Sequence, residues 1–174
     1  MYPIAIEILH GCDVCGSSEN LRPEMMICDS CLERSRKRNA KLHKIETENA
    51  LANFINGDGH HHLANGLRHT DGIQCLGDMA GAFWLIDLIA SYQPQLKKEG
   101  HEYFQLWYVT RSTSGLQYPE PCANVNGCTV TAWEDTPNIE RQPLVTQEIP
   151  ATDFPLDSIK LYCIDGVLML PSEN

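Results

Sequence analysis

Two cysteine pairs near the start of the chain, Cys12-x2-Cys15 and Cys28-x2-Cys31, constrain its fold more than any other feature. Structural zinc takes four soft ligands in a tetrahedron, and two cysteines separated by two residues let one tight turn present two thiolates to one ion. The pairs therefore predict one Zn²⁺ ion bound by Cys12, Cys15, Cys28 and Cys31. The alternatives are two disulfides, four idle thiols, or iron in a rubredoxin-like site.

The predicted role of this metal is structural. Four cysteine ligands leave no open coordination position for a water molecule or a substrate, so the ion contributes folding energy rather than catalysis. The second pair directly precedes a run of helix-forming residues, and Asp29 and Ser30 are residue types that begin helices. A knuckle followed by a pair at a helix start predicts a treble-clef module.

The charged residues are distributed unevenly along the 174 residues. Residues 1–44 hold seven basic and six acidic side chains, whereas residues 45–174 hold six basic and seventeen acidic side chains, a net charge of −11. Six cations follow one another without an acidic residue: Arg34, Arg36, Lys37, Arg38, Lys41 and Lys44. A helix carrying them could contact phosphates or a protein partner, or it could simply be a solvated helix, which is the favoured interpretation because so acidic a remainder repels nucleic acid.

The hydrophobic pattern predicts an α+β protein. An alternating strand is expected at Ile4–Ile8, and one long helix from Asp29 to about Ile55, where no Gly or Pro interrupts the chain. A histidine-rich loop, a helix capped by Thr70 or Asp71 and ending before Pro94, and several antiparallel strands should follow. Those strands are expected at Phe104–Thr110, Cys128–Trp133, Leu144–Ile149, Ile159–Ile164 and Val167–Leu170.

Two domains are therefore expected: a four-cysteine zinc-binding module with a basic helix at residues 1–44, and an acidic helix-plus-antiparallel-sheet domain at residues 45–174. An apolar fraction of 43% is enough for a core in the second domain. No apolar run approaches a membrane span, and four of the eight cysteines have metal spacing, which is typical of a protein of the reducing cytoplasm.

A second candidate site consists of the histidines His60, His61, His62 and His69. Imidazole titrates near neutral pH, so these residues, together with Asp71 and Cys75, are candidates for metal binding or acid–base chemistry. Their spacing matches no recognised motif, and an exposed loop is the favoured interpretation. No catalytic residue is predicted.

The stretch from Cys12 to Leu32 resembles the treble-clef zinc-binding domain at the head of Clp-family unfoldases, which pairs a Cys-x2-Cys-Gly knuckle with an Ile-Cys-Asp-x-Cys helix start. That module dimerises and docks adaptors, so the resemblance implies protein binding and makes a homodimer one expected assembly. No ATPase motif follows in this chain.

Residues 53–173 resemble a bacterial and phage family of unknown function that is often encoded on mobile elements. The resemblance is carried by Thr70–Gly72, Ala82–Gln93, Thr152–Asp157 and Asp165–Ser172. It implies a small cytoplasmic protein without an assigned activity.

Three functions are therefore considered. The favoured one is a non-enzymatic, zinc-containing interaction protein of a phage or mobile element that binds another protein, for example as an anti-CRISPR-like inhibitor whose acidic surface imitates phosphate charge. The second is a nucleic-acid-binding regulator that acts through the zinc module and the Arg34–Lys44 helix. The third is an enzyme that uses the His60–Cys75 region.

Overall fold

The computed structural model describes residues 13–17, 19–22, 27–57, 59–63, 66–117, 119 and 122–174. The chain divides into two compact units, Met1–His43 and Lys44–Asn174. Both helices and strands are present, so the α+β prediction is confirmed. The strand predicted at Ile4–Ile8 lies outside the described residues.

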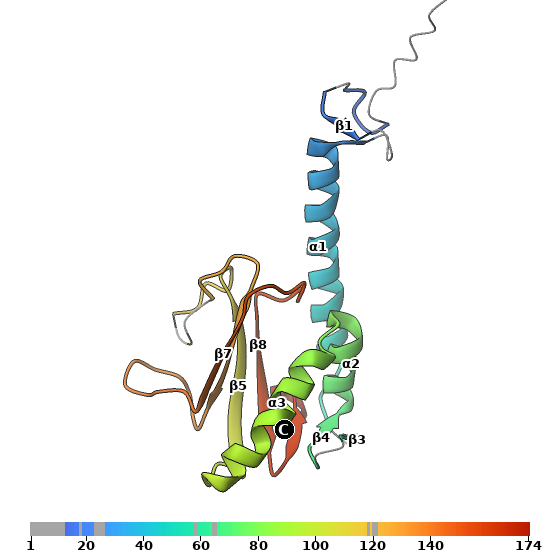
Figure 1. The fold of residues 1–174 in the computed structure, drawn as a ribbon. Coiled ribbons are helices and arrows are strands. Elements are labelled where there is room, and N and C mark those ends of the chain that lie inside the picture. The colour runs from blue at the N-terminus through green and yellow to red at the C-terminus, as the bar shows by residue number, and fades with distance from the viewer. Residues whose placement is uncertain are drawn as a thin grey trace, which may run out of the picture. The chain divides into compact units, whose positions relative to one another are not determined.

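The first unit contains a short antiparallel hairpin and the start of a long helix (Figure 1). The hairpin pairs β1 (Leu21–Arg22) with β2 (Ile27–Cys28), and helix α1 (Asp29–Leu51) begins directly after β2. The helix ends four residues before the predicted position. The Asn53 side-chain amide donates to the carbonyl oxygen of Asn49 at 2.9 Å, which occupies a terminal carbonyl group of the helix.

The second unit is built on a seven-stranded sheet with the order β3-β4-β9-β8-β5-β6-β7. The strands are β3 (His60–His62), β4 (Arg68–Thr70), β5 (Phe104–Arg111), β6 (Cys128–Trp133), β7 (Val145–Ile149), β8 (Ser158–Ile164) and β9 (Val167–Met169). The central strand β5 pairs with β6 on one side and β8 on the other, both antiparallel. A short 3₁₀ helix, Pro171–Glu173, closes the chain.

Two helices, α2 (Asp71–Ala80) and α3 (Phe83–Lys98), lie against one face of this sheet (Figure 1). Their fully buried residues Ile73, Leu85 and Ile89 pack with the strand residues Trp107 and Leu161 in the main apolar core. Gly81 separates the two helices. Its φ of 60° lies in the left-handed region that glycine adopts without strain, so the chain turns there between two helices.

Four details differ from the prediction. The histidine segment is a strand, because His61 pairs with His69 across β3 and β4. The sheet is mixed, because β4 and β9 run parallel. Pro94 lies inside α3 rather than after it. The Asn126-Gly127 turn precedes β6, but β6 pairs with the distant strand β5 instead of forming a tight hairpin there.

The turn between β8 and β9 follows the prediction closely. Asp165 and Gly166 have φ values of 48° and 73°, the pair of positive angles that a two-residue hairpin of matching twist needs. Aspartate and glycine tolerate these angles better than other residues, so the local sequence alone determines this hairpin.

The N-terminus of α2 is held by a residue from the far end of the chain. Thr70 occupies the N-cap position, as predicted, but its hydroxyl makes no capping bond. It instead donates to Glu173 Oε2 at 2.6 Å, while Glu173 Oε1 accepts the Gly72 backbone N–H at 3.0 Å. Glu173 is 7% exposed, and the backbone N–H of Leu170 also donates to it. This carboxylate therefore satisfies a helix terminus that nearby residues leave open.

Candidate metal centre

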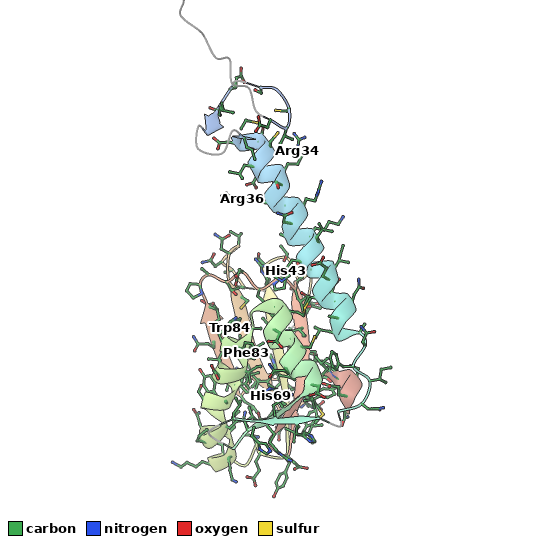
Figure 2. All side chains as sticks on the ribbon, turned by 90° about the vertical axis from the view of Figure 1, so that its right-hand side faces the viewer. Arg34, Arg36, His43, His69, Phe83 and Trp84 are labelled. Carbon is green, nitrogen blue, oxygen red and sulfur yellow. The ribbon has the colours of Figure 1, made fainter. Side chains whose placement is uncertain are left out.

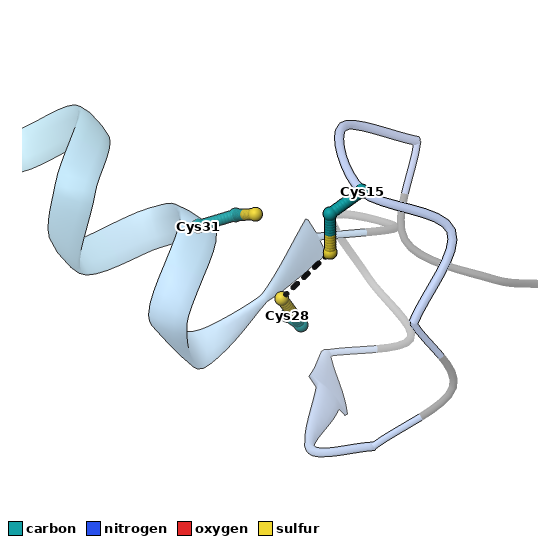
Figure 3. Close-up of side chains that lie close together, drawn as sticks. All are labelled: Cys15, Cys28 and Cys31. Atoms are coloured by element: carbon teal, nitrogen blue, oxygen red, sulfur yellow. Dashed lines mark hydrogen bonds between the residues drawn. The ribbon is translucent and has the colours of Figure 1, made fainter.

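Three of the four predicted metal ligands gather in the first unit (Figure 3). Cys15 lies in the turn at residues 13–15, Cys28 ends strand β2, and Cys31 lies in the first turn of α1. Cys28 and Cys31 are buried, whereas Cys15 is exposed. Helix α1 begins directly after Cys28, so Cys28 and Cys31 lie close together in the chain and in space. The turn at residues 13–15 places Cys15 next to them.

The sulfur positions suit a tetrahedral ion. The three sulfur atoms all lie within 4.8 Å of one another, and the Sγ atoms of Cys15 and Cys28 are 3.6 Å apart. Two sulfurs bound to one tetrahedral zinc ion at about 2.3 Å should be separated by about 3.8 Å. The three cysteines are free thiols, so the disulfide alternative is wrong for them. Cys12 lies outside the described residues.

The surroundings of Cys28 favour the thiolate that a metal needs. The Ser30 hydroxyl lies 3.2 Å from Cys28 Sγ, and this hydrogen bond is the main reason why the pKa of Cys28 is lowered below its ordinary value. The backbone N–H of Cys31 adds to the effect. The sequence suggested Ser30 as a helix-starting residue, but its contact with the sulfur is visible only in the structure.

The cations of α1 lie on an exposed part of the helix. Every residue from Glu33 to His43 is exposed, and Figure 2 shows Arg34 and Arg36 projecting from this helix. Among the described residues, Lys37 pairs with Glu33 at 3.4 Å and Lys44 pairs with Asp157 at 2.5 Å and Glu48 at 3.9 Å. Within the same described residues, no carboxylate lies within 4.0 Å of Arg34, Arg36, Arg38 or Lys41.

The predicted histidine site is only partly assembled. His61 and His69 stack with their ring centroids 5.1 Å apart, and His61 Nε2 lies 2.8 Å from Asp71 Oδ1. His69 is buried, and its Nε2 lies 3.0 Å from Gln74 Oε1. His60 and His62 are exposed on β3. In the part of the chain that the structure describes, the cysteine cluster alone brings three metal-ligating residues together.

The environments of Cys75, Cys128 and Cys163 disfavour the thiolate form. Burial raises the pKa of Cys75, and the nearby charge of Asp78 raises it further. Burial likewise raises the pKa of Cys128 to about 11 and that of Cys163 to about 12. Because the thiolate is the reactive form, these environments disfavour the cysteine–histidine nucleophile considered from the sequence.

None of the described helices combines the length and the apolar character that crossing a bilayer requires.

Comparison with known proteins places the second unit in a family. No curated protein and no solved structure is a significant match for this chain. A family model described as a family of unknown function (DUF6876) matches residues 45–174, which cover the sheet, α2 and α3. The chain therefore belongs to this family of unknown function, DUF6876.

Proposed function

We propose that this protein is a non-enzymatic binding protein in which one zinc ion stabilises the first unit and the acidic second unit binds another protein. The observation that carries the proposal is the net charge of −11 over residues 45–174. Several of the carboxylates are well exposed, among them Glu134 at 70% and Asp135 at 60%. A surface of this sign attracts basic partners and repels polyanions.

The metal in this proposal is zinc, held by Cys12 together with Cys15, Cys28 and Cys31. A turn, a short hairpin and a helix that starts with the last ligand pair follow one another in the order of a treble clef, which supports that architecture. With four sulfur ligands the ion has no open position, so it stabilises the module and takes no part in a reaction.

The acidic surface also suits an inhibitor. A carboxylate-rich face can occupy the basic surface that a nucleic-acid-binding enzyme offers to phosphates. For a protein of a phage or mobile element, such an activity would serve as counter-defence. This origin is part of the proposal.

The test is capture of a partner by the full-length, zinc-loaded chain. We expect a reproducible protein partner at about 0.1 M salt that is released at about 1 M salt, where the Debye length falls to about 3 Å. A variant with Glu134 and Asp135 changed to lysine should retain less partner, whereas changing Lys97 and Lys98 to glutamate should not reduce capture. Recovery of no reproducible protein would refute the proposal.

A second candidate function is nucleic-acid binding through α1, and the exposed cations favour it. Arg34, Lys37, Arg38 and Lys41 occupy positions i, i+3, i+4 and i+7 of the helix, so they lie on one side of it, whereas Arg36 lies on the other. Such a row can follow a phosphate backbone.

A gel-shift titration of a duplex of about 30 base pairs tests this candidate. If four cations contact phosphates, the affinity should fall with salt with a logarithmic slope of about −3.6. Arg34→Glu together with Arg38→Glu should abolish the shift, and Arg36→Glu, on the opposite side, is the matched control. No shift at low salt eliminates this function.

A further inference from the structure

The central residue of strand β3 is held on one face of the sheet, and its two neighbours project from the other face. His61 pairs with His69 across β3 and β4, the two rings stack, and His61 Nε2 lies 2.8 Å from Asp71 Oδ1. Successive side chains of a strand point to opposite faces, so His60 and His62 both point away from the face that carries His61. The contacts of His61 therefore fix the direction of both neighbours.

The imidazoles of His60 and His62 are accessible to a ligand. Both residues are exposed, and among the described strands β3 has β4 as its one neighbour, so it lies at the edge of the sheet (Figure 1). Within the described part of the chain, neither ring makes a hydrogen bond or an ion pair, in contrast to His61 and His69. Two neighbouring nitrogen donors on one face of a strand are therefore uncommitted.

The spacing of the two rings suits a single metal ion. Residues i and i+2 of a strand lie about 6.7 Å apart, whereas two imidazole nitrogens bound to one ion at about 2.1 Å lie about 3 Å apart. Each ring has to lean about 2 Å toward the other, which rotation about its two side-chain torsions permits. Because His61 already holds the strand, chelation by His60 and His62 orders little additional backbone, which keeps its entropic cost small.

The donor atoms and the nearby charge determine which ion fits and how it is held. Imidazole nitrogen suits Zn²⁺, Ni²⁺ and Cu²⁺, whereas Mg²⁺ and Ca²⁺ prefer oxygen ligands. The half-buried Arg68 lies in register with His62, and its positive charge opposes the binding of a cation there. Two nitrogen ligands beside this guanidinium make an exchangeable site, unlike a centre with several thiolate ligands.

We propose that His60 and His62 form a second metal site, in which the two imidazoles chelate one divalent transition-metal ion and water completes its coordination. Of the four histidines singled out from the sequence, these two bind the ion, whereas His61 and His69 hold the strand that presents them. The site is separate from the cysteine cluster and does not depend on the function proposed above.

The test is a titration of the isotope-labelled, zinc-loaded full-length chain with Ni²⁺, which binds imidazole and does not oxidise thiols. We expect saturable broadening of the amide resonances of residues 60–62, and no change with Mg²⁺ at the same concentrations. His60→Ala and His62→Ala should each weaken Ni²⁺ binding at least about tenfold, because one imidazole cannot chelate the ion. Both side chains are exposed, so neither variant should unfold the second unit. Arg68→Gln should strengthen binding, because it removes the cation in register with His62.

His61→Gln is the matched control, because it removes an imidazole from the same strand and keeps an N–H donor for Asp71. This variant should change the Ni²⁺ affinity less than about twofold, since residue 61 lies on the opposite face. Equal losses in the variants at His60, His61 and His62 would show that any exposed histidine suffices and would overturn the chelate. Broadening confined to residues 13–43, release of zinc without broadening of residues 60–62, or no saturable binding up to about 1 mM Ni²⁺ would also overturn it.

Discussion

The two units of this protein are stabilised in different ways. In the first unit, the buried described residues are Cys28 and Cys31, with Leu21 and Ile27 packed against them. In the second unit, a continuous apolar core joins α2 and α3 to the central strands. Among the described residues, the first cluster is too small to offset the conformational entropy of ordering its chain, and the proposed metal ion would supply the difference. The second unit does not depend on metal in this way.

Polar side chains also have different roles in the two units. In the first unit, the Cys28 sulfur and the Ser30 hydroxyl contact each other at the candidate metal centre. In the second unit, a buried carboxylate holds the end of a helix, and the amides of Gln93 and Gln105 bond each other at 3.0 Å within the packed interior. Polar groups therefore have defined partners in both units, and under the proposed function only those of the first unit hold a metal ion.

The largest expected effect is that of metal removal. Structural zinc contributes about 10–16 kcal/mol in small zinc-binding modules. Chelation, or Cys28→Ser, should release the ion and unfold the described part of residues 13–43, while residues 104–169 keep their hydrogen-exchange protection. The measurements are one zinc per chain by elemental analysis and exchange by mass spectrometry.

Cys75→Ala is the control for this prediction, because Cys75 lies outside the cluster and should leave the metal content unchanged. Loss of protection in both units on chelation would show that the comparison between them is wrong.

A cavity in the core of the second unit should lower the stability of that unit. Phe154 is fully buried and its ring packs edge-on against Trp84 with centroids 6.3 Å apart. Phe154→Ala should lower the free energy of unfolding by about 3–5 kcal/mol, as measured by denaturant titration. Zinc content should stay at one ion per chain. A variant that also loses its metal would contradict the independence of the two units.

Glu173 should have a smaller but measurable effect. Glu173→Ala removes a buried acceptor that serves Thr70, Gly72 and Leu170, so we expect a loss of about 2–3 kcal/mol from the stability of the second unit. Hydrogen exchange should accelerate most in the first turn of α2. Glu99→Ala, an exposed residue just after α3, should cost less than about 0.5 kcal/mol. Equal costs for the two variants would exclude the helix-holding role of Glu173.

The ion pair between Lys44 and Asp157 should have the smallest effect. The hydrogen bond from Lys44 lowers the pKa of Asp157 below its ordinary 3.8 and raises the pKa of Lys44 above its ordinary 10.5. The stabilisation is therefore fully present between these two values, is lost as the pH falls through the lowered pKa of Asp157, and is lost again as the pH rises through the raised pKa of Lys44.

Asp157→Asn should reduce stability at pH 7 by about 0.5 kcal/mol, because the Asp157 side chain is 39% exposed and solvent screens the pair. Thermal unfolding of variant and parent at pH 7 and pH 3 is the measurement. The difference between them should shrink at pH 3, and a difference that grows there would contradict the assigned sign.

Local patterns were sufficient wherever neighbouring residues decide the conformation. Contacts within a few residues determine two of the predicted features, the unbroken helix after Cys28 and the Asp165-Gly166 turn. The sequence could therefore predict both. The sequence missed the strand character of His60–His62, because three polar residues on an edge strand show no hydrophobic alternation.

What the sequence determined by itself is the chemistry of the first unit, the uneven charge and the α+β class. The tertiary structure alone decided which distant residues meet: β4 lies beside β9 in parallel, and Glu173 lies at the start of α2. Such meetings arise from packing between segments that are far apart in the chain, and no local propensity encodes them. Metal ligands can be recognised from their spacing, whereas a binding surface exists only once the sheet has been assembled.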